Sequence, residues 1–306
     1  MKKALITGGS GFLGKALRHY LIEQGYEVFT FDTSYGNNTK DHLRGSVIQY
    51  ADVESAVFGM DVVFHLAGLL GTTELLTQNL EAVDVNIKGT LNVLEACLRH
   101  GVKTIFYPTK PNEWLNTYSI TKRAGEEFAQ MYASLHKLDI RILRWLNAYG
   151  PGQKAYPIRK AVPVMIIQAL AGVDIEVWGT GNQPVDLIFS QDLARNTVLY
   201  TLKEKGDAMV RDTGNSIRMT VNERAEMIQT MANSRARIKH LPMRLGENQA
   251  QPVQLLPSPT AADLLGLTAS TTALEDGMSA TIEYYARLST QAHEAVLTFY
   301  YGRRAA

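Results

Sequence analysis

The sequence predicts an α/β fold in which a doubly wound parallel sheet carries a smaller, mixed α/β lobe. In the first half of the chain, short β-branched runs alternate with segments whose apolar residues recur at helical spacing. A glycine-rich turn directly follows the first of these runs. After residue 148 the alternation loosens, so a chain of 306 residues divides into two regions, 1–148 and 149–306.

The first region contains six short runs that predict the strands of the sheet. They cover residues 4–7, 27–31, 46–50, 62–66, 104–107 and 140–145. Three segments between them, 15–24, 83–100 and 119–135, carry apolar residues at helical spacing and predict helices. Strands that alternate with helices in this way form parallel βαβ units, with helices on both faces of the sheet.

The second region opens with the turn Tyr149-Gly150-Pro151-Gly152. Beyond it, the pattern predicts a helix over 162–171 and strands over 175–178 and 186–190. The stretch 250–260 is rich in Gln, Pro and Ser and predicts an irregular crossing before a last helix. This region is expected to form mainly the substrate-binding lobe, with some segments that return to the main sheet.

Composition favours a compact protein that acts on small molecules. Hydrophobic residues make up 45% of the chain, and a net charge of +1 predicts neither nucleic acid nor a membrane surface as a partner. The single cysteine, Cys97, lies in an apolar helical pattern and is expected to be a buried core thiol. No metal site is predicted. The N-terminal apolar stretch is too short for a signal peptide, which predicts cytoplasmic residence.

A phosphate-binding turn follows the first predicted strand. It runs Thr7-Gly8-Gly9-Ser10-Gly11-Phe12-Leu13-Gly14 and opens into a helix. Gly8 allows the tight turn, Gly11 lets backbone amides approach a pyrophosphate, and Gly14 permits close packing of helix on strand. Ser10, Phe12 and Leu13 lie where the amides of the helix N-terminus face the phosphates. Strand, turn and helix in this order predict a Rossmann-type dinucleotide site.

Acidic residues at the next two strand ends predict the adenosine contacts. Asp32 ends the second predicted strand, where a carboxylate accepts hydrogen bonds from the ribose hydroxyls and repels a 2′-phosphate. Thr33 and Ser34 follow it in place of an arginine, which favours NAD over NADP. Two interpretations fit Asp52: with Val53 it covers the adenine, or it is the N-cap of a helix ahead of Ser55.

The candidate catalytic pair is Tyr118 and Lys122. A spacing of four at the start of a helix puts both side chains on one face. A phenol is a poor base at neutral pH, but a neighbouring ammonium and a positively charged nicotinamide ring stabilise the phenolate. These charges are expected to lower the pKa of Tyr118 toward the working range.

Five motifs in a fixed order between residues 8 and 152 together resemble the extended short-chain dehydrogenases, the NAD-dependent epimerase/dehydratase family, and the resemblance covers nearly the whole chain. They are Gly8-x-x-Gly11-x-x-Gly14, His65-Leu66-Ala67-Gly68, Asn86-x-x-Gly89-Thr90, Tyr118-x-x-x-Lys122 and Asn147-x-Tyr149-Gly150-Pro151-Gly152.

The resemblance implies a role for each matching residue. Tyr118 is the general acid/base, Lys122 is its partner, and Thr109 hydrogen-bonds the reacting sugar hydroxyl. The cofactor path is lined by Leu66, Ala67 and Gly68, and Asn86 supports the active-site helix. The implied substrate contacts are Asn147, Gln183 and Arg244, with Arg244 on the diphosphate because a guanidinium pairs well with phosphate oxygens. A homodimer through the helices at 83–100 and 119–135 is also implied.

Two departures from the family pattern affect the substrate pocket. The segment from Thr109 to Tyr118 is short, and Lys110-Pro111 stands where the dehydratases carry an Asp-Glu pair; Glu113 is a possible substitute. The second departure is Val185, which stands at the usual position of a diphosphate-binding arginine. Arg244, Arg159 and Lys160 are the candidates to replace that arginine.

The function implied by the resemblance is that of an NAD-dependent nucleotide-sugar epimerase. Tyr118 removes a proton from a sugar hydroxyl at C4 while NAD accepts the hydride, and reduction on the opposite face inverts the centre. Within the same family, a dehydratase, a decarboxylase and a ketoreductase are alternatives. From another class, a dinucleotide-binding sensor or scaffold without catalysis remains an alternative, because a fold alone does not give a function.

Overall fold

The parallel sheet predicted from the alternating pattern forms the centre of the molecule. The computed structural model describes residues 1–110, 114–203, 206–213, 218–248 and 260–302, and within them the main sheet has seven strands in the order β10-β6-β5-β4-β1-β2-β3. All neighbouring strands in it are parallel. The strands are β1 (Lys3–Thr7), β2 (Glu27–Asp32), β3 (His42–Arg44), β4 (Val62–His65), β5 (Thr104–Thr109), β6 (Asp139–Arg144) and β10 (Val210–Asp212).

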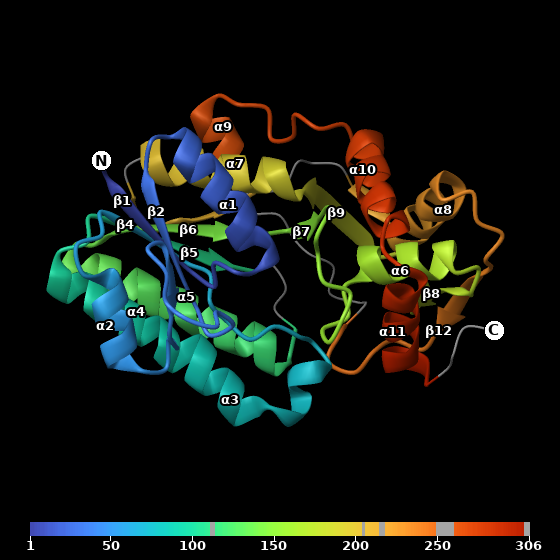
Figure 1. Ribbon diagram of the computed structural model, residues 1–306, viewed down its shortest axis with the longest axis horizontal. Coiled ribbons are helices and arrows are strands. Elements are labelled where there is room, and N and C mark those ends of the chain that lie inside the picture. Colours follow the sequence, from blue (N-terminus) through green and yellow to red (C-terminus); the bar gives the residue numbers. More distant parts are fainter. Residues whose placement is uncertain (111–113, 204–205, 214–217, 249–259, 303–306) are drawn as a thin grey trace.

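Helices cover both faces of this sheet (Figure 1). One layer contains α1 (Phe12–Glu23), α7 (Ser190–Lys203) and α9 (Ala261–Leu265), and the other contains α2 (Tyr50–Val57), α4 (Gly89–His100) and α5 (Thr117–His136). Side chains alternate between the two layers because a strand has a period of two residues. Ile6 therefore packs into the core under α1 and α7, whereas its neighbour Leu5 packs into the core under α2, α4 and α5.

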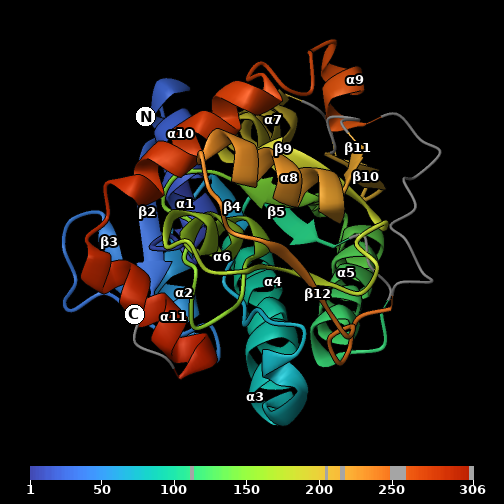
Figure 2. The same ribbon diagram turned by 90° about the vertical axis from the view of Figure 1, so that its right-hand side faces the viewer.

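A π-helical turn interrupts the helix that leads into α4. The predicted helix 83–100 starts earlier, as α3 (Asn79–Val83), and continues through a π-helical segment, η2 (Asp84–Lys88), into α4; the short 3₁₀ helix η1 (Glu74–Thr77) precedes them. Figure 2 shows α3 and α4 running end to end as one rod. A π turn inserts one residue into the helix and changes where the following side chains point. Asn86 lies in this turn and is buried.

The second region forms a smaller lobe with its own core, at the right of Figure 1. Two small sheets build it, a parallel pair of β8 and β12 and a three-stranded sheet in the order β11-β9-β7. The lobe contains β7 (Asn147–Tyr149), α6 (Ala161–Leu170), β8 (Ile175–Trp178), β9 (Pro184–Phe189), β11 (Arg218–Thr220), α8 (Val221–Met231), β12 (Ile238–Leu241), α10 (Leu274–Ala286) and α11 (Thr290–Tyr301).

Segments of the second region also lie against the main sheet. Helix α7 packs on one face of it, and β10 adds the edge strand beside β6. Arg144 on β6 and Asp212 on β10 form a bidentate ion pair, with Nε–Oδ1 at 2.5 Å and Nη2–Oδ2 at 2.8 Å. The chain therefore crosses between the two parts more than once, and the division at residue 148 stays a prediction.

The prediction of a strand at 46–50 is wrong. The third strand is β3 at His42–Arg44, and Tyr50 already begins α2. Gly45 ends the strand because a side chain there would collide with the ring of Phe31. Val47, the residue that suggested a strand, instead fills the core below α4.

Other elements differ from prediction mainly at their ends. The helices predicted from residues 15 and 119 begin two to three residues earlier, at Phe12 and Thr117, because Gly11 and Asn116 are their N-caps. The strand predicted at 186–190 is β9, at Pro184–Phe189. Cys97 is a buried core thiol, as expected, and burial raises its pKa. The expected crossing at 250–259, Pro111 and Glu113 lie outside the described residues.

No helix among the described residues is both long and apolar enough to span a membrane.

Asp192 joins α7 to the turn that leads into α10. Its buried carboxylate accepts hydrogen bonds from the Thr271 hydroxyl at 2.6 Å, the Ser270 hydroxyl at 2.9 Å, and the amides of Thr271 and Thr272 at 3.2 and 3.1 Å. Burial by itself would raise the pKa of Asp192, but these hydrogen bonds outweigh it and hold the pKa below its usual value. One carboxylate therefore ties the main sheet's helix layer to the lobe.

We predict that Asp192→Asn lowers the free energy of unfolding by about 1–3 kcal/mol at pH 7, because an amide group would face the donors of residues 270–272. The folded-state pKa lies below the unfolded value, so the contribution of Asp192 is present at neutral pH and is lost as pH falls through the folded pKa. Urea unfolding of both proteins from pH 7 to pH 3 should show the difference shrinking. The exposed Asp276→Asn variant is the control. An unchanged gap at low pH would contradict the assignment.

Candidate active site

The carboxyl ends of the central strands bring together residues that are far apart in the sequence. Thr7 ends β1, Asp32 ends β2, His65 ends β4 and Thr109 ends β5. Because these strands are parallel, all four residues lie along one edge of the sheet, where ligands bind in open α/β folds. Three of them, Thr7, His65 and Thr109, are buried.

The glycine turn is shaped for a close backbone approach. Gly8 has a φ of +71°, and a Cβ on it would lie 2.9 Å from the amide nitrogen of Ala67. A Cβ on Gly14 would lie 2.6 Å from the carbonyl oxygen of Gly8, so α1 packs against the turn without an intervening side chain. Gly11 is the N-cap of α1, and no side chain caps its first turn. The amides of Phe12 and Leu13 therefore remain directed at the space where a pyrophosphate would sit, and the turn fits a dinucleotide.

Asp32 lies beside this turn as an ionised carboxylate. Its Oδ2 accepts hydrogen bonds from the Ser10 amide at 3.1 Å and the Ser10 hydroxyl at 2.7 Å, and its Oδ1 accepts one from the Ser34 amide at 3.0 Å. Burial opposes ionisation, but these hydrogen bonds prevail and lower the pKa of Asp32. A negatively charged acceptor next to the phosphate turn fits the ribose hydroxyls of NAD.

The structure contradicts the interpretation of Asp52 as an N-cap, whereas its place over the adenine with Val53 stays a prediction. Asp52 lies inside the first turn of α2, whose N-cap is Gln49, and its carboxylate accepts a hydrogen bond from the Ser46 amide at 3.1 Å. Val53 is 1% exposed in the core, and its amide donates to the carbonyl of Gln49. These positions follow from the misplaced third strand, which put the helix start too late.

A chain of hydrogen bonds connects the strand ends to α4. His65 Nδ1 lies 2.8 Å from the hydroxyl of Thr7, and its Nε2 lies 3.0 Å from the hydroxyl of Thr90. The Thr7 hydroxyl also accepts a hydrogen bond from the Ala67 amide. Burial, with a smaller effect of the Lys122 charge, lowers the pKa of His65 to about 3, so this ring is neutral at physiological pH. The sequence showed His65 in a family motif but gave no sign of this bridging role.

Asn86 extends the same network to the catalytic helix. Its side-chain oxygen accepts a hydrogen bond from the Leu69 amide at 2.7 Å, and its Nδ2 donates to the Leu69 carbonyl and to the Thr121 hydroxyl on α5. A Cβ on Gly68 would lie 3.0 Å from the Asn86 oxygen, so the loop after β4 passes closely over this amide. Leu66, Ala67 and Gly68 are thereby held between the glycine turn and η2.

Tyr118 and Lys122 lie in the first two turns of α5, whose N-cap Asn116 accepts a hydrogen bond from the Ser119 amide. Both side chains are half-buried. Burial raises the pKa of Tyr118 to about 12 and lowers the pKa of Lys122 to about 7, the latter opposed by Glu126. The surrounding side chains therefore do not produce the lowered tyrosine pKa that we expected. The physical reason is that desolvation dominates both groups.

Tyr107 and Gly125 set the position of the catalytic helix. The Lys122 ammonium lies 4.0 Å above the ring of Tyr107, and the Tyr107 hydroxyl donates to the Lys122 carbonyl at 3.1 Å. A Cβ on Gly125 would collide with that hydroxyl. α5 thus approaches β5 closely because residue 125 has no side chain.

Thr109, at the end of β5, carries a buried hydroxyl without a partner. The residue is 3% exposed, and its Oγ1 makes no hydrogen bond of acceptable geometry within the described part of the chain, although the carboxyl of Glu126 is near enough to have its pKa lowered by this hydroxyl. A buried hydroxyl without a partner costs free energy. Its free hydrogen-bonding capacity suits a ligand at the strand end.

The predicted substrate residues Asn147, Gln183 and Arg244 lie in the second region of the chain. Asn147 is exposed and donates to the Asp186 carbonyl, and Gln183 donates to the Trp178 carbonyl. The Arg244 guanidinium is held by Glu247, with Nε–Oε1 at 3.0 Å. The loop that carries it contacts the main domain, because Asn116 Nδ2 donates to the Gly246 carbonyl at 2.7 Å.

Four cationic side chains lie near one another and near the same carboxylates, and we call them the cationic cluster: Lys110, Lys160, Arg224 and Arg244. The carboxylate of Glu247 faces three of them, Lys110, Arg224 and Arg244. Glu74 is the carboxylate that acts on Lys160, whose charge in turn lowers the pKa of Lys110. Within the described part of the chain, four cations against two carboxylates leave an excess of two positive charges. Such an excess favours an anionic ligand.

Sequence reasoning missed Arg224 as a site residue. It lies on α8, is 6% exposed, and its Nε has no hydrogen-bond partner among the described residues. Burial lowers its pKa to about 10, against the opposing effect of Glu247. Strand β11, which leads into α8, pairs with the strand that carries Val185. An arginine on the otherwise apolar face formed by Val221, Ala225 and Ile228 was the signal that could have identified it.

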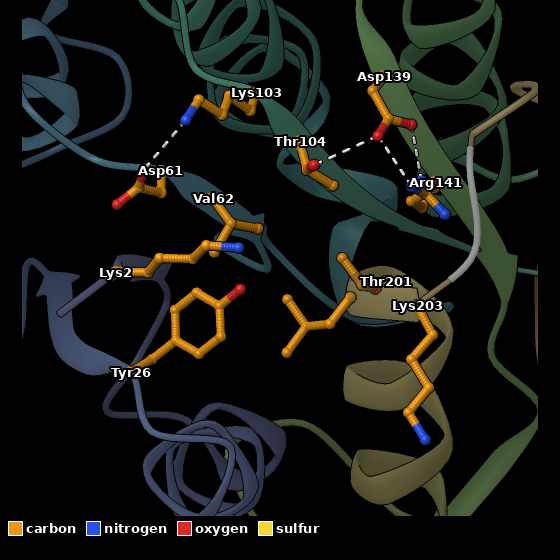
Figure 3. A pocket seen from close by; sticks show the side chains of 11 residues that line it. Lys2, Tyr26, Asp61, Val62, Lys103, Thr104, Asp139, Arg141, Thr201 and Lys203 are labelled. Carbon is orange, nitrogen blue, oxygen red and sulfur yellow. Dashed lines mark hydrogen bonds and ion pairs between the residues drawn. The ribbon is translucent and has the colours of Figure 1, made fainter.

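A cavity lies at the amino ends of the strands, opposite the candidate site. Figure 3 shows its lining side chains, which stand at the amino ends of the strands and include Lys2, Asp61, Lys103, Asp139 and Arg141. Its volume is ≈ 310 Å³, and its charges are largely paired internally: Lys103 with Asp61, and Arg141 with Asp139. Among the described residues no His, Cys, Asp and Glu cluster could hold a metal ion.

The fold and the site together define a Rossmann-type protein of the extended short-chain dehydrogenase class. A model of the NAD dependent epimerase/dehydratase family matches residues 4–210. The chain belongs to this family.

Relatives within the family catalyse more than one reaction. The chain is 30% identical over 270 residues to the UDP-N-acetyl-alpha-D-glucosaminuronate decarboxylase of Bacillus cytotoxicus, a match that covers 79% of this chain and 84% of that protein. It is 25% identical over 312 residues to the UDP-glucose 4-epimerase of Mycolicibacterium smegmatis, covering 92% and 98% of the two chains. The solved structure of MoeE5 in complex with UDP-glucuronic acid and NAD matches with a TM-score of 0.82 at 25% identity, covering 93% of this chain and 99% of that one.

We predict that Gly125→Ala lowers the free energy of unfolding by about 1–3 kcal/mol and impairs catalysis, because the added methyl group displaces the Tyr107 hydroxyl from the Lys122 carbonyl. Thermal unfolding and turnover measure the two effects. Gly36→Ala is the matched control, because a Cβ there meets nothing within 4 Å. Equal stability of the two variants would show that Tyr107 does not constrain α5.

Proposed function

We propose that this protein is an NAD-dependent nucleotide-sugar epimerase that oxidises the sugar at C4 and reduces it again on the opposite face. The observation that carries the proposal is the placement of the buried Thr109 hydroxyl, the Tyr118–Lys122 helix and the glycine turn along one edge of the sheet. Membership of the NAD dependent epimerase/dehydratase family and relatives that act on UDP-sugars support it.

NAD would be held by residues of the main domain. The turn amides of Phe12 and Leu13 face its pyrophosphate, Asp32 accepts from the adenosine ribose, and Lys122 binds the nicotinamide ribose. The loop Leu66 to Gly68 lines its path. When bound, NAD supplies the hydride acceptor and donor that no amino-acid side chain provides.

The catalytic side chains hold and move one proton. Thr109 accepts or donates the hydrogen bond that orients the sugar hydroxyl, and Tyr118 takes the proton from that hydroxyl and later returns it. Burial raises the pKa of Tyr118 to about 12 even with the Lys110 ammonium 5.0 Å from its ring, so the phenol is protonated at neutral pH until a further positive charge is brought near it. Tyr118 is therefore a neutral phenol in the protein alone, and it becomes the base only in the assembled complex.

The lobe would bind the diphosphate. Val185 stands where the family carries an arginine, and Arg224 and Arg244 offer guanidinium groups in the cationic cluster nearby. A guanidinium binds phosphate oxygens in a bidentate manner. Gln183 and Asn147 complete this wall of the pocket.

A decarboxylase is the second candidate, favoured by the 30% identity to a decarboxylase of a nucleotide-linked uronic acid. It shares the oxidation at C4 and differs in the fate of the product. A dehydratase is disfavoured because Lys110 follows Thr109 where an acid would be needed. A homodimer through α4 and α5 and cytoplasmic residence stay predictions; Met131 and Leu135 on α5 are exposed apolar residues that a partner would cover.

We expect one sugar nucleotide from a panel of UDP-, GDP-, dTDP- and CDP-sugars, uronic acids included, to change on incubation with the purified protein. Proton NMR without added cofactor identifies the product. A stereoisomer establishes the epimerase, and loss of carbon dioxide establishes the decarboxylase. No change in any sample, even after NAD(H) and NADP(H) are added, would refute both.

Tyr118→Phe should reduce kcat about 10²- to 10⁴-fold, because it removes the group that transfers the proton. NAD affinity, measured by fluorescence titration, should stay within twofold of the wild type. The exposed Tyr284→Phe variant is the control. Undiminished turnover in Tyr118→Phe would disprove the catalytic assignment.

Arg224→Met should weaken binding of UDP, or of the corresponding nucleoside diphosphate that the panel selects, about tenfold, because a desolvated guanidinium–phosphate contact is lost. Isothermal titration calorimetry measures the affinity, and Arg287→Met, an exposed arginine on the lobe, is the control. An unchanged affinity would remove Arg224 from the diphosphate site.

A further inference from the structure

Lys110 occupies a place next to the catalytic tyrosine that the proposed reaction does not use. It follows Thr109 directly, and its ammonium lies 5.0 Å from the centre of the Tyr118 ring and 5.3 Å from that of Trp114. Its Nζ donates a hydrogen bond to the Ser119 hydroxyl at 2.8 Å. A hydroxyl and two aromatic faces therefore fix the position of this cation.

Among the residues that the structure describes, the charge of Lys110 has no ion-pair partner of its own. In the described part of the chain no carboxylate lies within 4 Å of its ammonium; Glu247 acts on it from farther away and is shared with Arg224 and Arg244. Lys160 adds a like charge close by. A half-buried ammonium costs free energy unless an anion balances it, and a neutral hydroxyl does not supply that balance. Burial, which Glu247 opposes and Lys160 reinforces, lowers the pKa of Lys110 to about 8.

The chemistry of a sugar nucleotide decides which anion this position would meet. The diphosphate is attached at C1, across the ring from C4. The carbon next to C4 is C5, and its substituent is a neutral CH₂OH in an ordinary hexose and a carboxylate in a uronic acid. The other neighbour of C4 is C3, whose hydroxyl is neutral, so a cation beside the tyrosine that acts at C4 can meet an anion on the sugar only at the C5 substituent.

We propose that Lys110 binds a carboxylate on the sugar, so that the substrate is a nucleotide-linked uronic acid. This inference rests on the proposed function, because it takes Tyr118 as the group that acts at C4. Lys110 makes a charge-assisted hydrogen bond to the carboxylate, Ser119 holds the ammonium in place, and Trp114 covers it. Lys110 is then a specificity-determining residue, and Arg224 and Arg244 serve the diphosphate.

Binding of a matched pair of ligands tests the inference. UDP-glucuronate and UDP-glucose differ in the C5 substituent alone, so the contribution of the diphosphate cancels between them; another nucleoside takes the place of uridine if the panel selects it. In NAD-saturated Tyr118→Phe protein, which holds a ligand without turning it over, we expect calorimetry to give at least tenfold tighter binding of the uronate.

Variants at Lys110 separate charge from hydrogen bonding. Lys110→Gln keeps a donor for Ser119 and loses the charge, and Lys110→Met loses both; each should remove the preference for the uronate and leave the affinity for UDP within threefold. Lys110→Arg should retain most of the preference. The exposed Lys154→Met is the control. Arg224→Met should weaken UDP, UDP-glucose and UDP-glucuronate by the same factor.

Two results would overturn the inference. Equal affinity of the unsubstituted site for the two sugars needs no variant at Lys110 and would exclude a carboxylate site even if those variants fail to fold. Lys110 variants that weaken UDP as much as the uronate would assign Lys110 to the diphosphate. Loss of all sugar-nucleotide binding in Tyr118→Phe protein that still binds NAD, together with an inactive panel, would instead refute the proposed function.

Discussion

A network of buried hydrogen bonds, centred on His65, holds the site together. It joins the end of β1 through Thr7 to the end of β4, and through Thr90 and Asn86 to the π turn before α4. From Asn86 it reaches Thr121 and hence the helix that carries Tyr118. Because the His65 ring is neutral and fully buried, the network is stable across the physiological pH range. The glycine turn and the catalytic helix are placed relative to one another by these contacts.

Desolvation is the common theme of the site's electrostatics. It raises the pKa of Tyr118, lowers that of Lys122 and lowers that of Lys110, so each group is less charged than in water. Among the described residues, the cationic cluster adds an excess of positive charge, with Lys110 on the main domain and Lys160, Arg224 and Arg244 on the lobe. Both features make the site responsive to what binds in it: positive charge near Tyr118 produces the base, and negative charge near the cluster restores neutrality.

Much of the main domain and its edge residues could be predicted, and the failures have identifiable causes. Glycine spacing and period-two runs are local signals, so β1, β4, β5, β6 and the turn at Gly8 were predicted close to their places. The strand at 46–50 was misassigned because a buried Val47 looks the same in a strand as in a loop that fills the core. The same error put the start of helix α2 too late, so Asp52 was offered as its N-cap. The sequence showed Lys110 at a position where the dehydratases carry an acid. Its contacts with Ser119 on α5 and with Trp114 in the preceding loop depend on the fold.

The sequence by itself determined the family, the doubly wound sheet, the phosphate turn and the Tyr118–Lys122 spacing, because each depends on residues that are close together along the chain. The tertiary structure alone decided which polar groups meet. It brings Glu247 to Lys110, Arg224 and Arg244, places His65 between Thr7 and Thr90, and buries the hydroxyl of Thr109. These interactions join residues as far apart in the sequence as Lys110 and Glu247. They depend on burial, which a linear pattern does not encode.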